Sequence, residues 1–529
     1  MCGILLRFSR SSNVEIDDDY TFQGAKQLVS ERGTDYQNLI HISSNNGVSS
    51  LYSSVLSIRS PFTQQPLQSE LYTVQFNGEL YNKEIKDKND GHWILELLHD
   101  YNNIFKVIGT LEGEFAYTIL VHKEKKIYFG KDQLGKKSLA YAVIDGTLYI
   151  SSCIPDVPTR TCFHECENLS MYIFDMETSE ITISPFKDNE YLPNEYLVSD
   201  VRDIGIYQPL ISQIVESLTG AVSTRTNNIH TLNPSIAKYA ILFSGGIDCS
   251  LLASLAATTS YPGATIDLLN VSFYNPRTKT LPENTPDRKL GIQNWENLCR
   301  MYPHIRFQFI EVDVTYEEYM EHKEKVKQLI YPNNTEMDLS IAIAFYFASR
   351  GKGSSRINAD EKIPYESTCK VLLSGLGADE LFGGYTRHER FFTPTSNIRK
   401  KHNKSTSFET VDANLYHLLQ QELQKDLSNL WIRNLSRDDK VIACWSKEVR
   451  YPFLDTHFIN DATSVPLNLK LHYDPQSGDI TRKWILRQVA DQLDMGWVSN
   501  EAKRAIQFGA KSAKMEAGSG KMKGTDKLT

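Results

Sequence analysis

One stretch constrains the fold of this chain more than any other, namely YAILFSGGIDCSLLASLAA at residues 239–257. Its apolar start predicts a buried strand, Ser-Gly-Gly predicts a tight turn, and a helix is expected from about Asp248. Such a turn aims backbone N–H groups and a helix N-terminus at an anion, as a phosphate cradle does. The stretch therefore predicts an α/β domain with an anion site at a strand end.

A second turn, in VLLSGLGADELFGGY at residues 371–385, places Asp379 and Glu380 among four glycines after a short apolar strand. Ligands of open α/β sheets bind at such strand ends, which makes a solvated turn the weaker alternative. We expect Asp248 and Asp379 to meet there and to bind Mg²⁺ on a leaving pyrophosphate. Lys483 would offset the charge that grows as pyrophosphate leaves, unless it is only a surface helix lysine.

The first turn matches neither of the two common phosphate-binding patterns, because GxxxxGK[ST] and GxGxxG are both absent. The remaining interpretation is the SGGxDS loop of the ATP pyrophosphatases. Cys249 replaces the first of its two usual serines and is a poorer hydrogen-bond donor. The candidate loop residues are Ser244, Gly245, Gly246, Asp248, Cys249 and Ser250.

The chain opens MCGILLRFSR, so removal of Met1 would leave Cys2 as the N-terminal residue. One residue would then supply both a thiol nucleophile and an amine base, whose pKa near ~8 suits that task. A second-position cysteine alone is weak evidence. It gains weight from the stretches that follow: ERGTD at 31–35, SIRSPFTQQPL at 57–67, FNGELYN at 76–82, and Asp90.

The length of 529 residues exceeds what one hydrophobic core usually supports and predicts two domains. The first 200 residues read as strands and turns with helical stretches between, which indicates a mostly antiparallel α+β domain over 2–200. From about Tyr207 short apolar runs alternate with helices, which indicates a doubly wound parallel sheet over 207–515. The small, polar residues 516–529 are expected to be a disordered tail.

Composition excludes several classes of function. The net charge of −8, with the one basic cluster at 399–404, argues against nucleic acid as a partner. No run reaches the apolar length of a membrane span, and eight cysteines without a CxxC pair fit a reducing, cytoplasmic location. Zinc at Cys162, His164 and Cys166 is a minor alternative, since zinc ligands rarely show this alternate spacing.

Taken in order, these motifs resemble the glutamine-dependent asparagine synthetases, and more closely the asparagine synthetase domain-containing proteins. MCGI, RG, QPL, NGE, LEGEFA and GKDQLG match the class II glutamine amidotransferase half. SGGIDCS, SGLGADELFGGY, KEVRYPFLD and KWILR match the synthetase half. The resemblance implies an N-terminal nucleophile domain, an αββα sandwich, followed by an α/β ATP pyrophosphatase domain with a doubly wound parallel sheet.

For the first half, the resemblance implies that Cys2 attacks the side-chain amide of glutamine. Asn77 and the N–H of Gly78 would form the oxyanion hole. Arg32 would pair with the glutamine α-carboxylate, as suits a guanidinium, and Asp90 would pair with the α-ammonium. The residues expected to bind glutamine are Arg32, Glu79 and Asp90.

For the second half, it implies that ATP activates aspartate as β-aspartyl-AMP. Ammonia from glutamine then crosses an apolar passage and displaces AMP to give asparagine. The expected cofactors are ATP and Mg²⁺, and a homodimer is a further expectation. Besides the SGGxDS loop, ATP and pyrophosphate would contact Ser374, Gly375 and Lys483, and Mg²⁺ would be held by Asp248 and Asp379.

One departure from the family leaves the reaction open. The glutamate of the family's SGEG sequence, thought to manage a proton in the ammonia step, is Leu376 here. Leucine cannot accept a proton. Two alternatives to asparagine synthesis therefore stay open: amidation of a different carboxylic acid, and a regulatory protein that keeps the fold.

Overall fold

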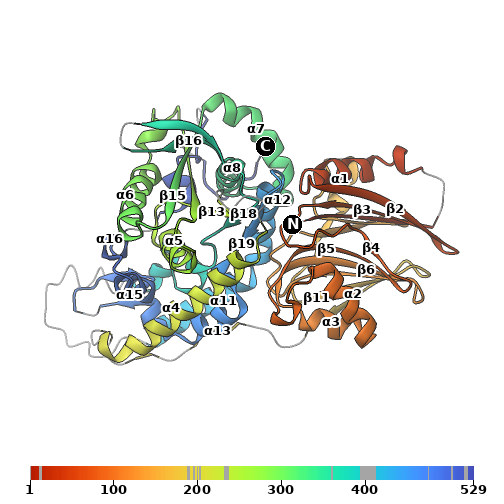
Figure 1. Ribbon diagram of the computed structural model, residues 1–529, viewed down its shortest axis with the longest axis horizontal. Helices are drawn as coiled ribbons and strands as arrows, with labels where there is room; N and C mark the ends of the chain where they lie inside the picture. Colours follow the sequence, from red (N-terminus) through yellow and green to blue (C-terminus); the bar gives the residue numbers. More distant parts are fainter. Residues whose placement is uncertain are drawn as a thin grey trace.

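The computed structural model describes the chain except Met1, Pro475 and Thr529 and the ranges 11–14, 187–190, 195–196, 199–200, 202–203, 231–236, 359–360, 394–412, 502–503 and 517–521. The basic cluster at 399–404 lies outside the described residues. Two lobes lie side by side, with the N-terminal lobe on the right of Figure 1.

The first lobe contains two six-stranded antiparallel sheets. One has the order β10-β8-β9-β1-β3-β2 and the other β12-β11-β7-β6-β5-β4. The strands of the first sheet are β1 (Cys2–Ser9), β2 (Tyr36–Ser44), β3 (Gly47–Val55), β8 (Ala140–Ile144), β9 (Thr147–Ser151) and β10 (His164–Glu165). Those of the second are β4 (Leu67–Gln68), β5 (Tyr72–Leu80), β6 (Gly113–Val121), β7 (Lys126–Lys131), β11 (Ser170–Asp175) and β12 (Ile181–Pro185).

The side-chain alternation of β1 explains the layering of this lobe. Leu6 and Phe8 pack with Phe129 between the sheets, whereas Leu5 packs with Phe22 of α1 (Tyr20–Ser30) on the outer face. The outer face of the second sheet is covered by α2 (Asp90–Tyr101) and α3 (Ile104–Thr110). The predicted αββα sandwich is confirmed.

The second lobe is built on a seven-stranded sheet with the order β17-β16-β15-β14-β13-β18-β19. The run from β15 to β19 is parallel, and β16 and β17 add antiparallel strands at one edge. After β13 the chain forms β14 on one side of β13, and it later forms β18 on the other side of β13. This switch point is where a doubly wound sheet binds ligands. The strands are β13 (Tyr239–Leu242), β14 (Thr265–Phe273), β15 (Arg306–Val314), β16 (Lys352–Arg356), β17 (Lys362–Glu366), β18 (Val371–Leu373) and β19 (Glu448–Arg450).

Helices surround this sheet (Figure 1). They are α4 (Ile204–Asn227), α5 (Ile247–Thr259), α6 (Pro286–Met301), α7 (Tyr316–Ile330), α8 (Glu336–Arg350), α9 (Ala378–Leu381), α11 (Ala413–Ser428), α12 (Ser436–Ala443), α13 (Thr456–Ser464), α14 (Leu467–Lys470), α15 (Trp484–Gln492), α16 (Gly496–Ser499) and α17 (Ile506–Gly509). A small hairpin of β20 (Leu471–Tyr473) and β21 (Ile480–Arg482) precedes α15. None of the described helices is long and apolar enough to cross a membrane.

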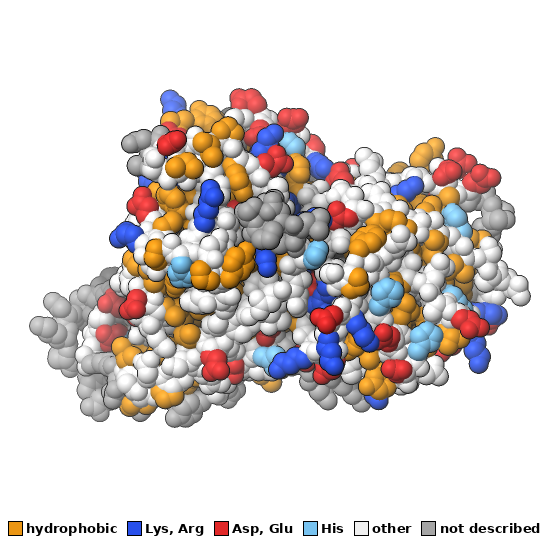
Figure 2. Space-filling view, viewed as in Figure 1, with side chains coloured by type: hydrophobic (Ala, Val, Ile, Leu, Met, Phe, Trp, Pro, Cys, Tyr) orange, Lys and Arg blue, Asp and Glu red, His pale blue; other side chains and the backbone are white. Residues whose placement is uncertain are grey.

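The end of the chain differs from the expectation of a disordered tail. Residues 522–528 pair with the start of α8 through backbone hydrogen bonds, from Glu336 N to Asp526 O at 2.9 Å and from Leu528 N to Asn334 O at 2.7 Å. Composition missed this docking because backbone groups make the contact. On the face shown in Figure 2, Lys and Arg lie interspersed with Asp and Glu, without a basic stripe.

Candidate active sites

The first candidate site surrounds Cys2, the first residue of β1. Its backbone N donates to Asn77 Oδ1 at 2.8 Å, and its Sγ accepts from Gln65 Nε2 at 3.3 Å. Only 7% of the residue is exposed, and burial raises the pKa of the thiol. The thiol therefore needs a nearby base before it can act as a nucleophile.

Asn77 and Gly78, on β5, offer hydrogen-bond donors at this site. Asn77 Nδ2 is buried, and within the described part of the chain it has no hydrogen-bond partner. A buried unpaired donor is costly in free energy, and a developing oxyanion would satisfy it. Gly78 lines the same pocket at a φ of +146°, and a Cβ there would lie 2.0 Å from Glu114 O. Only glycine fits that position.

The guanidinium of this pocket is Arg59, which corrects the assignment of Arg32. Arg59 lines the pocket, with Nε 2.6 Å from Glu79 Oε1 and Nη1 3.2 Å from Asp90 Oδ1. Arg32 instead donates from Nη2 to Asp439 Oδ2 of the second lobe at 2.8 Å. The ERGTD stretch follows α1 at the face that meets the second lobe, so its arginine fastens the lobes together.

Glu79 and Asp90 both line the Cys2 pocket, as the sequence predicted. Burial raises the pKa of Asp90 well above its usual value, the charge of Glu79 adds to this, and Arg59 opposes it. A bound ammonium would relieve the cost of ionising this carboxyl.

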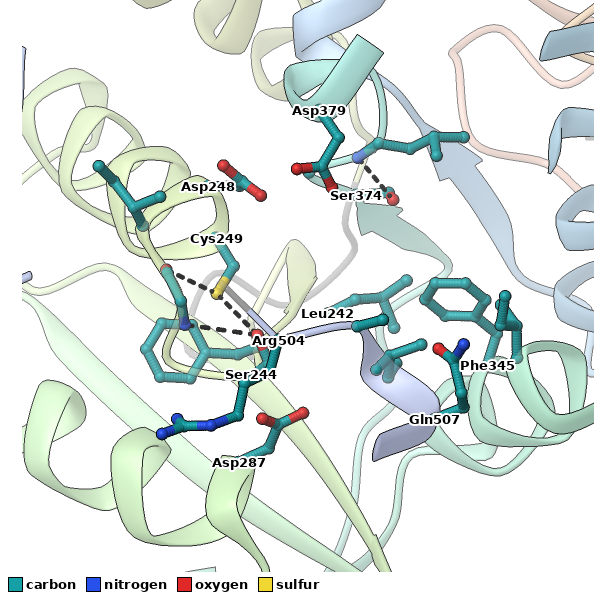
Figure 3. Close-up of a pocket in the computed structure, with 18 of the residues that line it drawn as sticks. Leu242, Ser244, Asp248, Cys249, Asp287, Phe345, Ser374, Asp379, Arg504 and Gln507 are labelled. Carbon is teal, nitrogen blue, oxygen red and sulfur yellow. Dashed lines mark hydrogen bonds between the residues drawn. The ribbon is translucent and has the colours of Figure 1, made fainter. Parts of the chain in front are cut away.

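The second candidate site is a cavity of about 200 Å³ at the β13/β18 switch point (Figure 3). It brings together most of the residues predicted from the two loops and from the start of α15. The predicted residues that line it are Ser244, Gly246, Asp248, Cys249, Ser374, Gly375, Asp379 and Lys483.

Lys483 lies between the two predicted metal ligands. Its Nζ is 2.7 Å from both carboxylate oxygens of Asp248 and 2.6 Å from Asp379 Oδ1. Lys483 is only 1% exposed, so the alternative that it is a surface helix lysine is wrong. Carboxylates close enough to share one ammonium are close enough to share one Mg²⁺, which uses one or two carboxylates besides phosphate oxygens and water. The residues present therefore fit the ion.

Gly384 makes this close arrangement possible, since a Cβ there would lie 1.9 Å from Asp379 Oδ1 and 2.2 Å from Lys483 Cε. Cys249 points its thiol at the loop backbone, with Sγ 3.2 Å from Gly246 O, and burial raises its pKa. In Figure 3 Cys249 lies between Asp248 and Ser244.

Two residues predicted to bind phosphate, Ser250 and Gly245, do not line the cavity and instead hold the shape of the loop. The Oγ of Ser250, fully buried, donates to Gly245 O at 3.3 Å, and Asn294 Nδ2 donates to the same oxygen at 2.6 Å. Gly245 has a φ of +82°, and a Cβ there would lie 2.7 Å from Gly291 N. A turn motif does not reveal which of its residues face inward.

Several lining residues were missed from the sequence. Gln507, on α17, is 6% exposed, and among the described residues its Oε1 has no hydrogen-bond partner. Figure 3 shows Gln507 near Phe345. Arg437 and Asp438, on α12, also line the cavity and gave no motif signal.

The two lobes are joined by buried ion pairs. Glu448 and Arg450 pair at 2.6 Å, and Arg450 Nη2 also reaches Glu79 Oε2 of the Cys2 pocket at 3.0 Å. Arg225 of α4 pairs with Glu114 of β6 at 2.8 Å. Within the described ranges, Cys162, His164 and Cys166 are not part of any group of three or more His, Cys, Asp or Glu residues placed to hold a metal ion.

Comparison with known proteins agrees with this architecture. The asparagine synthase family model matches residues 233–519, and the glutamine amidotransferase domain model matches residues 1–200. An asparagine synthetase domain-containing protein of Saccharomyces cerevisiae is 38% identical over 100% of this chain and 99% of its own length. One from Drosophila melanogaster is 28% identical, covering 97% and 98%. A putative glutamine-hydrolysing asparagine synthetase of Methanocaldococcus jannaschii is 25% identical, covering 87% and 82%. The chain belongs to the asparagine synthase family, with a glutamine amidotransferase domain before the synthase domain.

Proposed function

We propose that the protein makes asparagine from aspartate, using ATP and ammonia released from glutamine. The observation that carries the proposal is the buried Asp248–Lys483–Asp379 cluster at the switch point, where Nζ lies 2.6–2.7 Å from both carboxylates. Such a cluster suits binding of a nucleotide triphosphate with its metal. A second, nucleophile-bearing pocket in the same chain supports glutamine as the nitrogen source.

In the first site, Cys2 Sγ attacks the amide carbon of glutamine. The thiol proton passes to the α-amine of Cys2, which the removal of Met1 has freed. Asn77 Nδ2 and the N–H of Gly78 donate to the oxyanion, a contribution of ~3 kcal/mol for one such donor. Arg59 turns from its carboxylate partners to pair with the substrate α-carboxylate. Asp90 binds the α-ammonium, and ammonia leaves.

In the second site, the Ser244 loop cradles the phosphates while the aspartate side-chain carboxylate attacks the α-phosphorus of ATP. Mg²⁺, held by Asp248 and Asp379, would neutralise charge on the β- and γ-phosphates. Lys483 supplies a second positive charge beside the departing pyrophosphate. Ammonia then displaces AMP from β-aspartyl-AMP.

A second candidate function, amidation of another carboxylic acid, is favoured by Leu376. This side chain lines the cavity, and Ile341, Phe345 and Ala348 of α8 add further apolar lining. The homodimer and the cytoplasmic location stay predictions of the sequence.

The test is formation of AMP, pyrophosphate and asparagine by the purified protein with ATP, Mg²⁺ and glutamine, with and without aspartate. We expect aspartate-dependent AMP with matching asparagine. The Cys2→Ala variant should lose glutamine-driven synthesis and keep ammonia-driven synthesis. AMP and an amide only with a different acid would establish the second candidate, and no AMP with any acid would point to a regulatory protein.

A further inference from the structure

The proposed amidation must dispose of a proton. As ammonia attacks the acyl-adenylate, its nitrogen lone pair forms the C–N bond and the C–O bond to AMP breaks. The nitrogen has to lose one proton for a neutral amide to result. Leu376 cannot take it, so a different group beside the cavity must do so.

Asp438 is a carboxylate placed for this task. It is 2% exposed and lines the same cavity as Leu376. Arg437 Nε and Nη2 each lie 2.8 Å from its Oδ1. No hydrogen bond to Oδ2 is found within the described part of the chain. One oxygen is therefore anchored, and the other can accept a proton.

The helix that carries Asp438 lies between the two sites. The next two residues of α12 bind the first lobe: Asp439 accepts from Arg32 at 2.8 Å, and Lys440 Nζ contacts Glu165. Figure 1 shows α12 on the side of the second lobe that meets the first. The helix follows a short π-helix at Trp431–Leu435, a local distortion that is frequent at functional sites.

The contacts of Tyr451 also indicate that Asp438 lies near the first lobe. The backbone N of Tyr451 donates to Glu114 Oε1 of the first lobe at 3.1 Å. Burial and then the charges of Asp438 and Asp439 raise the pKa of its hydroxyl, so it lies within electrostatic reach of Asp438. Asp438 thus lies toward the end of the cavity that faces the Cys2 lobe, where ammonia would arrive.

We propose that Asp438 is the catalytic residue that accepts the proton from ammonia as the amide forms. The proton moves from nitrogen to Oδ2 as AMP departs with the C–O electron pair, and it passes to water after the product leaves. This role rests on the proposed function.

The surroundings of Asp438 suit a carboxyl that must hold a proton for part of the cycle. Burial raises its pKa, Arg437 lowers it, and the neighbouring charges of Asp338 on α8 and Asp439 raise it. The net direction is upward, which brings the carboxyl nearer to the working pH of a general base.

The test compares Asp438→Asn with the wild type, with ammonia as nitrogen source. We expect amide formation to fall by about 100-fold, as for loss of a general base, while aspartate-dependent ATP–pyrophosphate exchange stays near the wild-type rate. Asp439→Asn is the matched control: it removes the same charge from the same helix but from the face that binds Arg32. Its ratio of amide formation to exchange should equal that of the wild type.

Replacing ammonia by hydroxylamine distinguishes a catalytic role of Asp438 from a structural one. Hydroxylamine is uncharged at neutral pH and a stronger nucleophile than ammonia, so it needs less help from a base. The deficit of Asp438→Asn should therefore shrink at least tenfold with hydroxylamine. Normal amide formation, or an equal loss of exchange and amide formation, would overturn the role of Asp438. Absence of exchange in the wild type would instead overturn the proposed function.

Discussion

Arg450 of the second lobe binds Glu79 of the Cys2 pocket, with Nη2 3.0 Å from Oε2. The other oxygen of Glu79 accepts from Arg59 at 2.6 Å. Since Arg450 also pairs with Glu448, one guanidinium holds a carboxylate from each lobe. The wall of the first pocket is thus held in place by a residue of the synthetase sheet, which couples this pocket to the second lobe.

Replacing Arg450 by leucine should destabilise the whole protein. Glu448 and Glu79 would each lose one buried ion-pair contact, and breaking a buried ion pair typically costs about 3–5 kcal/mol. We expect a lower thermal unfolding midpoint and a higher KM for glutamine. Scanning calorimetry and glutaminase kinetics measure both, and Lys370→Leu, at a half-exposed ion pair with Asp35, is the control. An Arg450→Leu variant as stable as this control would contradict the coupling.

Arg59 and Arg32 should differ in their effect on glutamine use. Arg59→Lys keeps the charge but loses the planar fork, so kcat/KM for glutamine should fall by about 10- to 100-fold. Arg32→Lys should lower the thermal midpoint instead, because it weakens the bond to Asp439. Steady-state glutaminase assays on the two variants decide this. A selective rise in KM with Arg32→Lys would restore the assignment from sequence.

Arg59 and Arg32 illustrate which features of the structure can be predicted from the sequence and which cannot. The turn motifs and strand alternation predicted the doubly wound sheet and the two strand-end loops that bring Asp248 and Asp379 together, because local geometry dictates these features. Arg32 was assigned wrongly because a motif gives a residue's place in the chain but not the direction of its side chain. Asp438 gave no signal at all, since its role depends on packing between helices and lobes distant in sequence.

Lys470 should make stability depend on pH. It is fully buried on α14, its Nζ has no partner among the described residues, and burial lowers its pKa to about 7. In the unfolded chain the pKa of Lys470 is ~10.4. Between about pH 7 and that pH the unfolded chain therefore holds more protons than the folded chain, so the stability of the folded protein rises with pH. Below about pH 7 Lys470 is protonated in both the folded and the unfolded state. Its destabilising effect on the folded protein is therefore largest there and no longer changes with pH.

Lys470→Met should therefore stabilise the protein at neutral pH, by roughly 2–4 kcal/mol, and lose most of that advantage near pH 10. Thermal unfolding of the two proteins across this range provides the measurement. Lys370→Met, at a half-buried lysine that pairs with Asp35, controls for the general effect of losing a cation. An advantage that does not change with pH would mean that Lys470 is charged in the folded state.

Cys249→Ser should improve the use of ATP. The thiol lines the cavity where a hydroxyl would donate a stronger hydrogen bond to phosphate, and Gly246 O, 3.2 Å from Sγ, can accept from the new hydroxyl when no nucleotide is bound. One neutral hydrogen bond is worth about 0.5–1.5 kcal/mol, so KM for ATP should fall by roughly 2- to 10-fold. ATP–pyrophosphate exchange in the Cys2→Ala background measures this without the glutaminase reaction. Cys299→Ser, on α6 outside the cavity, should leave KM unchanged, and an unchanged KM in Cys249→Ser would show that this side chain does not contact phosphate.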